Sequence, residues 1–326
     1  MIQRFAVPVG AGAVSALLFA LTVKGTPLAL ALAYLAPMPL MIAAFGWGAF
    51  GGFLAALAAS AALIAVFDWQ GALAFLLIVA TPAWILPTFA ALPHYAPPWR
   101  RGDSDLPART PIGAVVTLAA ALGALAGLAG LATLIIGYSG YDAGLQALIS
   151  ELTPAIEQAL EGVDALPDGV SARDVAEEVA KLAPLATATL GFLTLCANLY
   201  AAGRSTALSH RLPRPWPDLP TEFVLPRPLA VAAVIAVGVA IALPEPVDQF
   251  AWVFAGPLAA AYALQGLAVL HALSRGLPLR PLLITALYFC CAVRVSWTLP
   301  LIALVGLVDS AVNLRAHAAA ARRSKS

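Results

Sequence analysis

The sequence predicts an all-α protein, a polytopic membrane bundle of about ten transmembrane helices with an amphipathic helical hairpin on its outer side. Of the 326 residues, 61% are hydrophobic and only 11% are charged, whereas soluble proteins carry about 25% charged residues. Such a chain has too few polar side chains to cover a water-exposed surface, and its high hydrophobicity excludes disorder. The apolar residues also recur in stretches of about 20, the length that a helix needs to cross a bilayer core.

Ten apolar stretches are candidate spans. The last two come from one apolar stretch, 281–314, which as a single helix would be about 51 Å long and is therefore divided near Arg294 and Pro300. If that stretch is one helix, the count is nine. The first stretch is longer than the apolar core of a signal peptide, about 7–15 residues, and is expected to stay in the protein. The stretches cover residues 5–23, 28–45, 49–67, 71–92, 112–137, 185–203, 229–243, 250–272, 281–293 and 298–314.

The distribution of charge predicts the orientation. With ten spans and the N-terminus inside, 14 of the 18 Lys and Arg residues fall on the inner side, as the positive-inside rule requires. We therefore expect a bacterial inner-membrane protein with both termini in the cytoplasm. Three regions follow: 1–111, four helices with a basic cytoplasmic loop; 112–228, two helices flanking an acidic external insertion (138–183); and 229–326, four helices with a basic cytoplasmic tail.

The external insertion has the pattern of two amphipathic helices. Leucine and isoleucine recur at helical spacing between residues 145 and 160, a turn is expected from Gly162 to Gly169, and Ser171 with Asp174 resembles a capping box that opens a second short helix. Two such helices are too small for a core of their own, so we expect them on the outer membrane face or the mouth of the bundle. Their acidic residues form either a solvated face or a funnel for cations.

No catalytic or cofactor motif is visible. The chain has no Walker A, GxSxG, HExxH or GxGxxG sequence, which argues against an enzyme. Its three cysteines lie in apolar runs without a CxxC pattern, so neither a metal site nor a cofactor is predicted. The net charge of +1 gives no reason to expect nucleic acid as a partner.

Polar residues inside predicted spans are the candidates for function, because each is costly in a bilayer unless it is paired or hydrated. Asp309 and Asn313 are four residues apart and share a helix face. Asp309 is within reach of Arg280 or Arg315, which favours a structural ion pair over a proton or substrate contact. Arg294 lies at the outer turn of the last hairpin, where its side chain either reaches the interface or contributes to a site.

Three further polar residues and one helix-break region complete the candidates. Asn198, Gln265 and His271 lie in other spans, where they serve either as hydrogen-bonding links between helices or as ligand contacts. Prolines end the second span and glycines follow it, which indicates either tight packing or a broken helix of the kind that frames transporter sites. This region contains Pro37, Pro39, Gly48 and Gly52.

Four short segments resemble a known family. The Pro37-Met-Pro39-Leu and Gly48-Ala-Phe-Gly-Gly52 segments, and the segments around His271 and Asp309, are similar to the YybS-like family of bacterial membrane proteins, which has no assigned function. That family is distantly similar to the substrate-binding S components of energy-coupling-factor transporters. This resemblance implies a membrane bundle that binds a small ligand and borrows ATPases from partners. The chain differs from the S components in having about ten predicted spans and an acidic external insertion.

Two functions of different class remain. The first is a ligand-binding or transport component without its own ATPase, which would need a partner ATPase, another membrane subunit or an ion gradient. The alternative is a non-catalytic envelope scaffold or assembly protein that acts through the external hairpin. In both cases the lipid bilayer is the certain partner.

Overall fold

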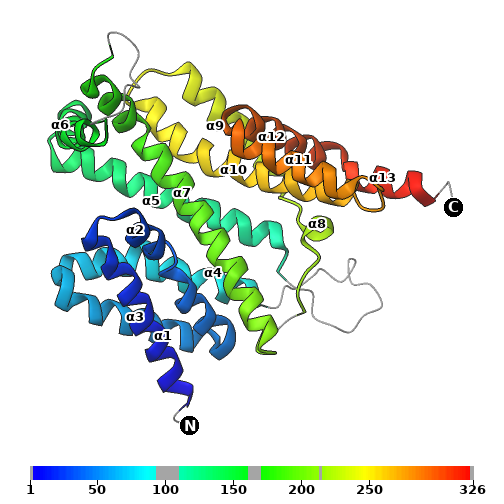
Figure 1. Cartoon of the computed structure of the whole chain (residues 1–326), viewed down its shortest axis with the longest axis horizontal. Helices are drawn as coiled ribbons and strands as arrows, with labels where there is room; N and C mark the ends of the chain where they lie inside the picture. Colours follow the sequence, from blue (N-terminus) through cyan, green and yellow to red (C-terminus); the bar gives the residue numbers. More distant parts are fainter. Residues whose placement is uncertain (1–2, 93–109, 161–169, 213–214, 324–326) are drawn as a thin grey trace. The chain divides into compact units, whose positions relative to one another are not determined.

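The computed structural model describes residues 3–92, 110–160, 170–212 and 215–323. Within these ranges every regular element is a helix, in agreement with the all-α prediction. In chain order (Figure 1) the elements are α1 (Gln3–Ala20), η1 (Leu21–Lys24), α2 (Pro27–Ala33), α3 (Pro37–Phe75), η2 (Leu76–Ala80), α4 (Thr81–Ala91), α5 (Ile112–Gly137), α6 (Tyr141–Leu160), α7 (Ala172–Leu208), α8 (Leu219–Glu222), α9 (Arg227–Ala242), α10 (Val247–Leu273), α11 (Arg280–Val293), α12 (Val295–Val312) and α13 (Leu314–Arg323).

Six helical stretches of the described residues are long and apolar enough to cross a membrane. A multi-span membrane protein is thus supported, whereas the predicted count of ten is not. Helices α9 and α11 have only 16 and 14 residues, about 24 and 21 Å, which is less than a bilayer core of about 30 Å. Three predicted spans also fall within one helical run. The six stretches are Arg4–Lys24, Pro27–Ala91, Ile112–Gly137, Ala172–Leu208, Val247–Leu273 and Val295–Val312.

Helix α3 is interrupted at two residues. Gly48 has φ 77° and ψ −179°, and Asp68 has φ 67° and ψ −175°. Glycine adopts a positive φ without steric cost. Asp68 supports its own conformation, because its Oδ1 accepts hydrogen bonds from the backbone N–H groups of Gln70 (2.8 Å) and Gly71 (2.9 Å). Both breaks lie between stretches that the sequence predicts as separate spans, so the 39-residue helix consists of three helical segments.

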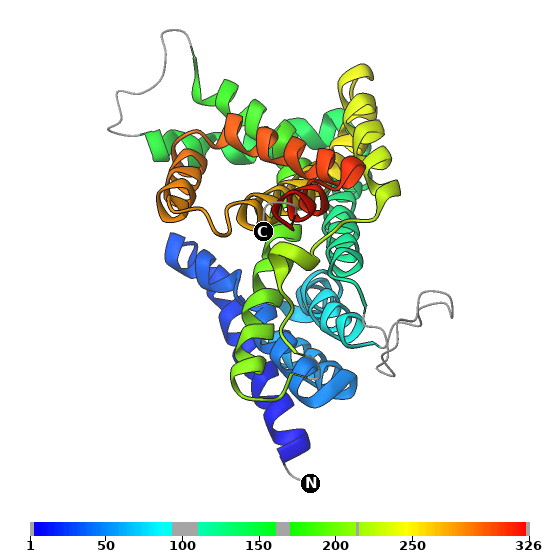
Figure 2. The same ribbon diagram turned by 90° about the vertical axis from the view of Figure 1, so that its right-hand side faces the viewer.

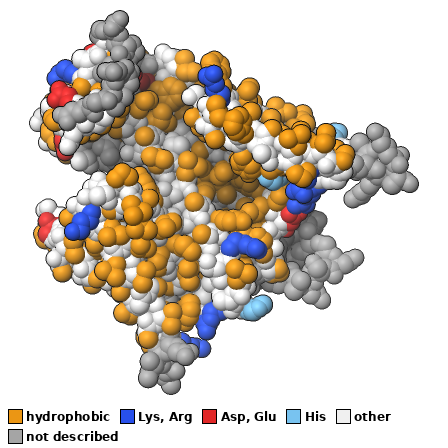
Figure 3. Space-filling model, viewed as in Figure 1, with side chains coloured by type: hydrophobic (Ala, Val, Ile, Leu, Met, Phe, Trp, Pro, Cys, Tyr) orange, Lys and Arg blue, Asp and Glu red, His pale blue; other side chains and the backbone are white. Residues whose placement is uncertain are grey.

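The chain divides into two compact units. Unit 1 comprises Met1–Ala119, Leu193–Arg227 and Ala261–Ser326. In this unit α1 packs along α3, as both views show (Figure 1 and Figure 2). Small residues allow the close approach, because a side chain at Gly12 would collide with the Ala55 carbonyl oxygen. The Ser15 hydroxyl adds a hydrogen bond to the Ala36 carbonyl (2.6 Å). Hydrophobic side chains cover the face of these helices that Figure 3 shows, as expected of a surface in contact with lipid.

Unit 2 comprises Ala120–Phe192 and Pro228–Ala260, and it contains the predicted external insertion. The apolar face of α6 is buried against α5 and α7 in a cluster formed by Leu131, Tyr141, Leu145, Ile149, Ala176 and Ala180. The capping box is confirmed: the Ser171 N–H donates to the Asp174 carboxylate (2.8 Å), and the Asp174 N–H donates to the Ser171 hydroxyl (3.2 Å).

The second amphipathic helix is not separate from the next span, which corrects the prediction of a short helix there. Helix α7 runs without interruption from Ala172 to Leu208 and contains Pro184. The expected turn from Gly162 to Gly169 lies outside the described residues. The division into three regions stays a prediction.

The predicted C-terminal hairpin is present as two helices. Helix α11 ends and α12 begins on either side of Arg294, whose φ of −131° and ψ of 50° interrupt the helix, and the two helices contact each other. The apolar stretch 281–314 is therefore not one unbroken helix. At its far end, Asn313 adopts the left-handed conformation (φ 53°) and separates α12 from α13.

Candidate functional site

A buried polar network in unit 1 brings together two of the predicted residues, Gln265 of α10 and Asp309 of α12. Gln265 is fully buried, and its Nε2 lies 3.0 Å from the Asp309 carboxylate, 3.0 Å from the Ser310 hydroxyl and 3.1 Å from the Gly306 carbonyl. Its Oε1 accepts a hydrogen bond from the Leu225 N–H (2.8 Å). One side chain thus ties two helices and the segment before α9 together.

Asp309 forms an ion pair with Arg315, one of its two expected partners. Nη2 of Arg315 lies 2.7 Å from Oδ2 of Asp309, and the two side chains are only 9% and 1% exposed. Nη1 of the same guanidinium donates to the Pro220 carbonyl (3.0 Å). Arg280, the other expected partner, is exposed at the start of α11 and makes no ion pair with a described residue. Of the two expected partners, Arg315 is the one that pairs with Asp309.

The pair forms because the chain turns back at Asn313. Residues six apart do not share a face of one α-helix, yet the left-handed Asn313 redirects the chain so that Arg315 returns to Asp309. The Asn313 N–H also donates to the Asp309 carbonyl (2.8 Å), as at a helix C-terminus. Asn313 therefore positions this site through its backbone, and its side chain is exposed.

An ion pair between Asp218 and Arg275 also holds the segment that precedes α9. The carboxylate of Asp218 accepts two hydrogen bonds from Arg275, at 2.6 and 2.7 Å. Hydrogen bonds from Arg275 and then from Thr221 lower the pKa of Asp218 to about 2. With the contacts to Gln265 and Arg315, segment 218–225 is held by three polar links. The network thus has the geometry of a structural element that holds helices together. Within it, only Oδ1 of Asp309 is buried without a hydrogen-bond partner among the described residues.

The other predicted polar residues lie apart from this network. The Asn198 amide donates to the carbonyls of Tyr34 and Thr194, at 2.8 Å each, and so links α7 to the segment before α3. The His271 ring contacts Tyr288 edge-on, with centroids 5.8 Å apart. Arg294 is exposed at its turn. No three His, Cys, Asp or Glu side chains of the described ranges gather where they could hold a metal ion.

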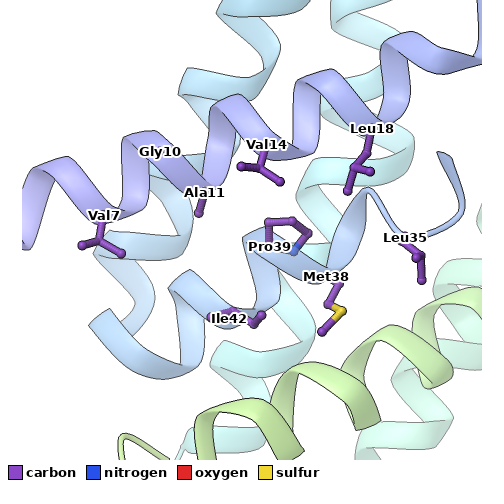
Figure 4. Close-up of a pocket in the computed structure, with 9 residues that line it drawn as sticks. All are labelled: Val7, Gly10, Ala11, Val14, Leu18, Leu35, Met38, Pro39 and Ile42. Atoms are coloured by element: carbon purple, nitrogen blue, oxygen red, sulfur yellow. The ribbon is translucent and has the colours of Figure 1, made fainter. Parts of the chain in front are cut away.

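One of the helix-break residues, Pro39, lines a groove. Pro37 is buried at the start of α3, and Gly52 lies so close to Ala44 and Trp84 that no side chain fits there. The Trp84 indole donates to the Ala49 carbonyl (2.8 Å), a backbone group just after the Gly48 break. Beside this bend, an open apolar groove of about 630 Å³ runs between α1 and the start of α3 (Figure 4). We call it the N-terminal groove; it is lined by Val7, Gly10, Ala11, Val14, Leu18, Leu35, Met38, Pro39 and Ile42.

Basic and aromatic residues lie close in the chain to the groove residues Val7 and Ile42. Trp47 follows Ile42 by five residues on α3, and the guanidinium of Arg211 lies over its indole at 4.4 Å from the ring centroid. The rings of Phe5 and Phe50 meet edge-to-face, with centroids 6.3 Å apart. Arg4 is exposed in the first turn of α1. We call Arg4, Trp47 and Arg211 the basic end of the groove.

The C-terminus of α7 positions Arg211. His210 adopts the left-handed conformation (φ 54°), its N–H donates to the Ala207 carbonyl (3.1 Å), and the Arg211 N–H donates to the Thr206 carbonyl (2.9 Å). This pattern is a Schellman motif, which ends a helix in a fixed geometry. Arg211 makes no ion pair with a described residue, and its guanidinium lies over the Trp47 ring.

Sequence reasoning identified Pro39 but missed the rest of the groove and its basic end. The groove-lining positions 7, 11, 14 and 18 follow helical spacing, but in a helix that is apolar on all sides this spacing does not stand out. The left-handed His210 and the position of Arg211 over Trp47 depend on tertiary packing and have no sequence signal.

Comparison with known proteins places most of the chain in one family. The sequence model of a family described as "Predicted membrane protein (DUF2232)" matches residues 13–310. No curated protein and no solved structure matches the chain. The resemblance to YybS-like proteins and to S components is not confirmed by these comparisons.

Proposed function

The chain belongs to the DUF2232 family of predicted membrane proteins, and we propose that it is a ligand-binding or transport component of the membrane without an ATPase of its own. The observation that carries this proposal is the N-terminal groove. An apolar groove of about 630 Å³ lies open along α1 and the start of α3, and apolar surface of this kind is stabilised by van der Waals contact with an apolar partner. A ligand with an apolar part would fill this space and supply that contact.

The interrupted helix beside the groove supports the same function. Discontinuous helices at a binding site are a recurrent feature of transporters, because broken backbone allows groups to be placed around a ligand. The bend at Gly48 and the prolines at the start of α3 make α3 a discontinuous helix of this kind beside the N-terminal groove. We further propose that the breaks in α3 separate individual spans, that ten spans form in the bilayer, and that both termini lie in the cytoplasm of a bacterial inner membrane. Energy for transport would come from a partner ATPase, another membrane subunit or an ion gradient.

The scaffold alternative is less well supported. A scaffold acting through the external hairpin would need an apolar helix face that is free for a partner. The apolar face of α6 is instead occupied by α5 and α7, since Leu145 and Ile149 pack against Leu131, Ala176 and Ala180. Only the polar side of α6 is left for an encounter with a partner.

The experiment is a gentle purification followed by mass spectrometry of the molecules that stay bound, with two matched variants. A leucine at Gly10 projects into open space within the groove and occupies it, whereas a leucine at Gly130 of α5 meets equally open space elsewhere. We expect wild type and Gly130→Leu to retain the same molecule and Gly10→Leu to lose it. Recovery of an empty protein without partners under several growth conditions would contradict the proposal.

A further inference from the structure

We infer that the N-terminal groove binds one acyl chain of an anionic phospholipid, with the phosphate of the lipid at the basic end. This inference rests on the proposed function and names the ligand class of the same site. It combines the length and lining of the groove with the charge of Arg211, which makes no ion pair among the described residues.

The length of the groove fits an acyl chain. Its lining extends along α1 from Val7 to Leu18, eleven residues or about 16 Å of helix. Half of a bilayer core of about 30 Å is about 15 Å, so the groove is as long as one leaflet is thick. The nine lining residues carry no charged or polar side chain, and a flexible hydrocarbon chain suits such a surface (Figure 4). A sugar or nucleotide would leave its polar groups unpaired there.

The basic end lies directly beyond the groove. A side chain placed at Gly51, one turn after Trp47, would lie 3.5 Å from the Pro8 ring, and Pro8 adjoins the groove residue Val7. Trp47, with Arg211 over its indole, is therefore next to the point where the lining begins. Tryptophan is the residue typical of the membrane interface, which places this end at headgroup depth.

The charge at this end selects an anionic headgroup. Arg211 makes no ion pair with any described residue, and its position over Trp47 leaves the N–H donors of the guanidinium edge free for phosphate oxygens. The first acidic residue of the chain is Asp68, and no acidic residue lies between Glu178 and Asp218. No carboxylate close in sequence therefore competes with a phosphate for the Arg211 guanidinium. Arg4, three residues before Val7, adds a second positive charge. Basic pockets between membrane helices on the cytoplasmic side bind anionic lipid headgroups in this way.

The test uses the full-length protein in nanodiscs that contain equal amounts of phosphatidylglycerol and phosphatidylcholine. The protein is released into mild detergent, and native mass spectrometry counts the lipids of each class that remain bound. Two variants address the site, Gly10→Leu for the groove and Arg211→Gln for the headgroup. Their matched controls are Gly130→Leu and Arg280→Gln, the latter being an exposed arginine away from the groove.

We expect wild type and both controls to retain one phosphatidylglycerol, and Gly10→Leu to retain none. Arg211→Gln should still retain a lipid but lose about fivefold in its preference for phosphatidylglycerol, the effect of one arginine charge at the surface. Equal retention of both lipids by wild type, or unchanged retention by Gly10→Leu, would overturn the inference, as would occupation of the groove by a second copy of the chain.

Failure of this inference is distinguishable from failure of the proposed function. If wild type retains a molecule that is not a phospholipid and Gly10→Leu loses it, the ligand-binding function stands and the lipid inference is overturned. If no molecule responds to Gly10→Leu, both are overturned.

Discussion

The ion pair between Asp309 and Arg315 makes a quantitative prediction about stability. Both side chains are buried, and Oδ2 of Asp309 receives hydrogen bonds from Arg315 (2.7 Å) and Gln265 (3.0 Å). Removal of one member of a buried pair strands the other charge and costs about 3–5 kcal/mol, whereas removal of both is often nearly neutral. The variants are Asp309→Ala, Arg315→Ala and the combination of the two.

The structure predicts that the two single variants differ. Asp309 lies inside α12 with 1% of its side chain exposed, so Arg315→Ala leaves a buried carboxylate without its opposite charge. We expect this variant to lose stability near the upper end of that range. Arg315 lies at the start of α13 with 9% exposed, and its long side chain can turn outward after Asp309→Ala. Asp309→Ala should therefore lose stability near the lower end of the range. The double variant should be more stable than Arg315→Ala alone.

The assay is thermal unfolding in detergent, followed through the fluorescence of the seven tryptophans. We expect the melting temperature to fall in the order wild type, then Asp309→Ala, then Arg315→Ala, with the double variant above Arg315→Ala. If Asp309→Ala melts with wild type, the structural account of the pair is wrong. Asp309, whose Oδ1 has no hydrogen-bond partner among the described residues, would then become the leading candidate for a proton or ligand contact.

Three further predictions concern packing, pH and topology. A methyl group at Gly306 would collide with the Tyr262 carbonyl oxygen, so Gly306→Ala should lower the melting temperature by the equivalent of about 1–3 kcal/mol, while Gly130→Ala, which meets open space, should not. The lowered pKa of Asp218 means that its bond with Arg275 contributes fully above the ordinary value of 3.8 and is lost as the pH falls to about 2; Arg275→Gln should therefore flatten the dependence of the melting temperature on pH below 4. Single cysteines are introduced into a protein without its native cysteines and labelled from outside. A cysteine at Asp164 should react, whereas cysteines at Ser104, Asp218 and Ser324 should not.

Composition and apolar run length predicted the membrane class and the helical fold, because a span must be long and apolar regardless of its neighbours. They did not predict the helix ends. The expected separation of a short outer helix from the next span fails because α7 continues through Pro184, which a long helix in a packed bundle tolerates. The breaks at Gly48 and Asp68 lie where spans were expected to end, yet the helix resumes at once on the far side.

The candidate sites show the same limit. The pairing of a buried carboxylate with an arginine was predicted from the free-energy cost of an unpaired charge inside a membrane span, which requires a partner for Asp309. The choice of Arg315 over Arg280 was not, because it depends on the left-handed Asn313. The N-terminal groove depends on how α1 packs beside the start of α3, which no single stretch of sequence encodes.

The most direct test of the central claim, that the N-terminal groove is a ligand site, is a cryo-electron microscopy structure of the chain in nanodiscs of anionic lipid. The account predicts elongated density along α1 from Val7 to Leu18 that ends in a headgroup beside Arg211. A groove closed by its own side chains, or one without density while lipids around other helices are resolved, would contradict it.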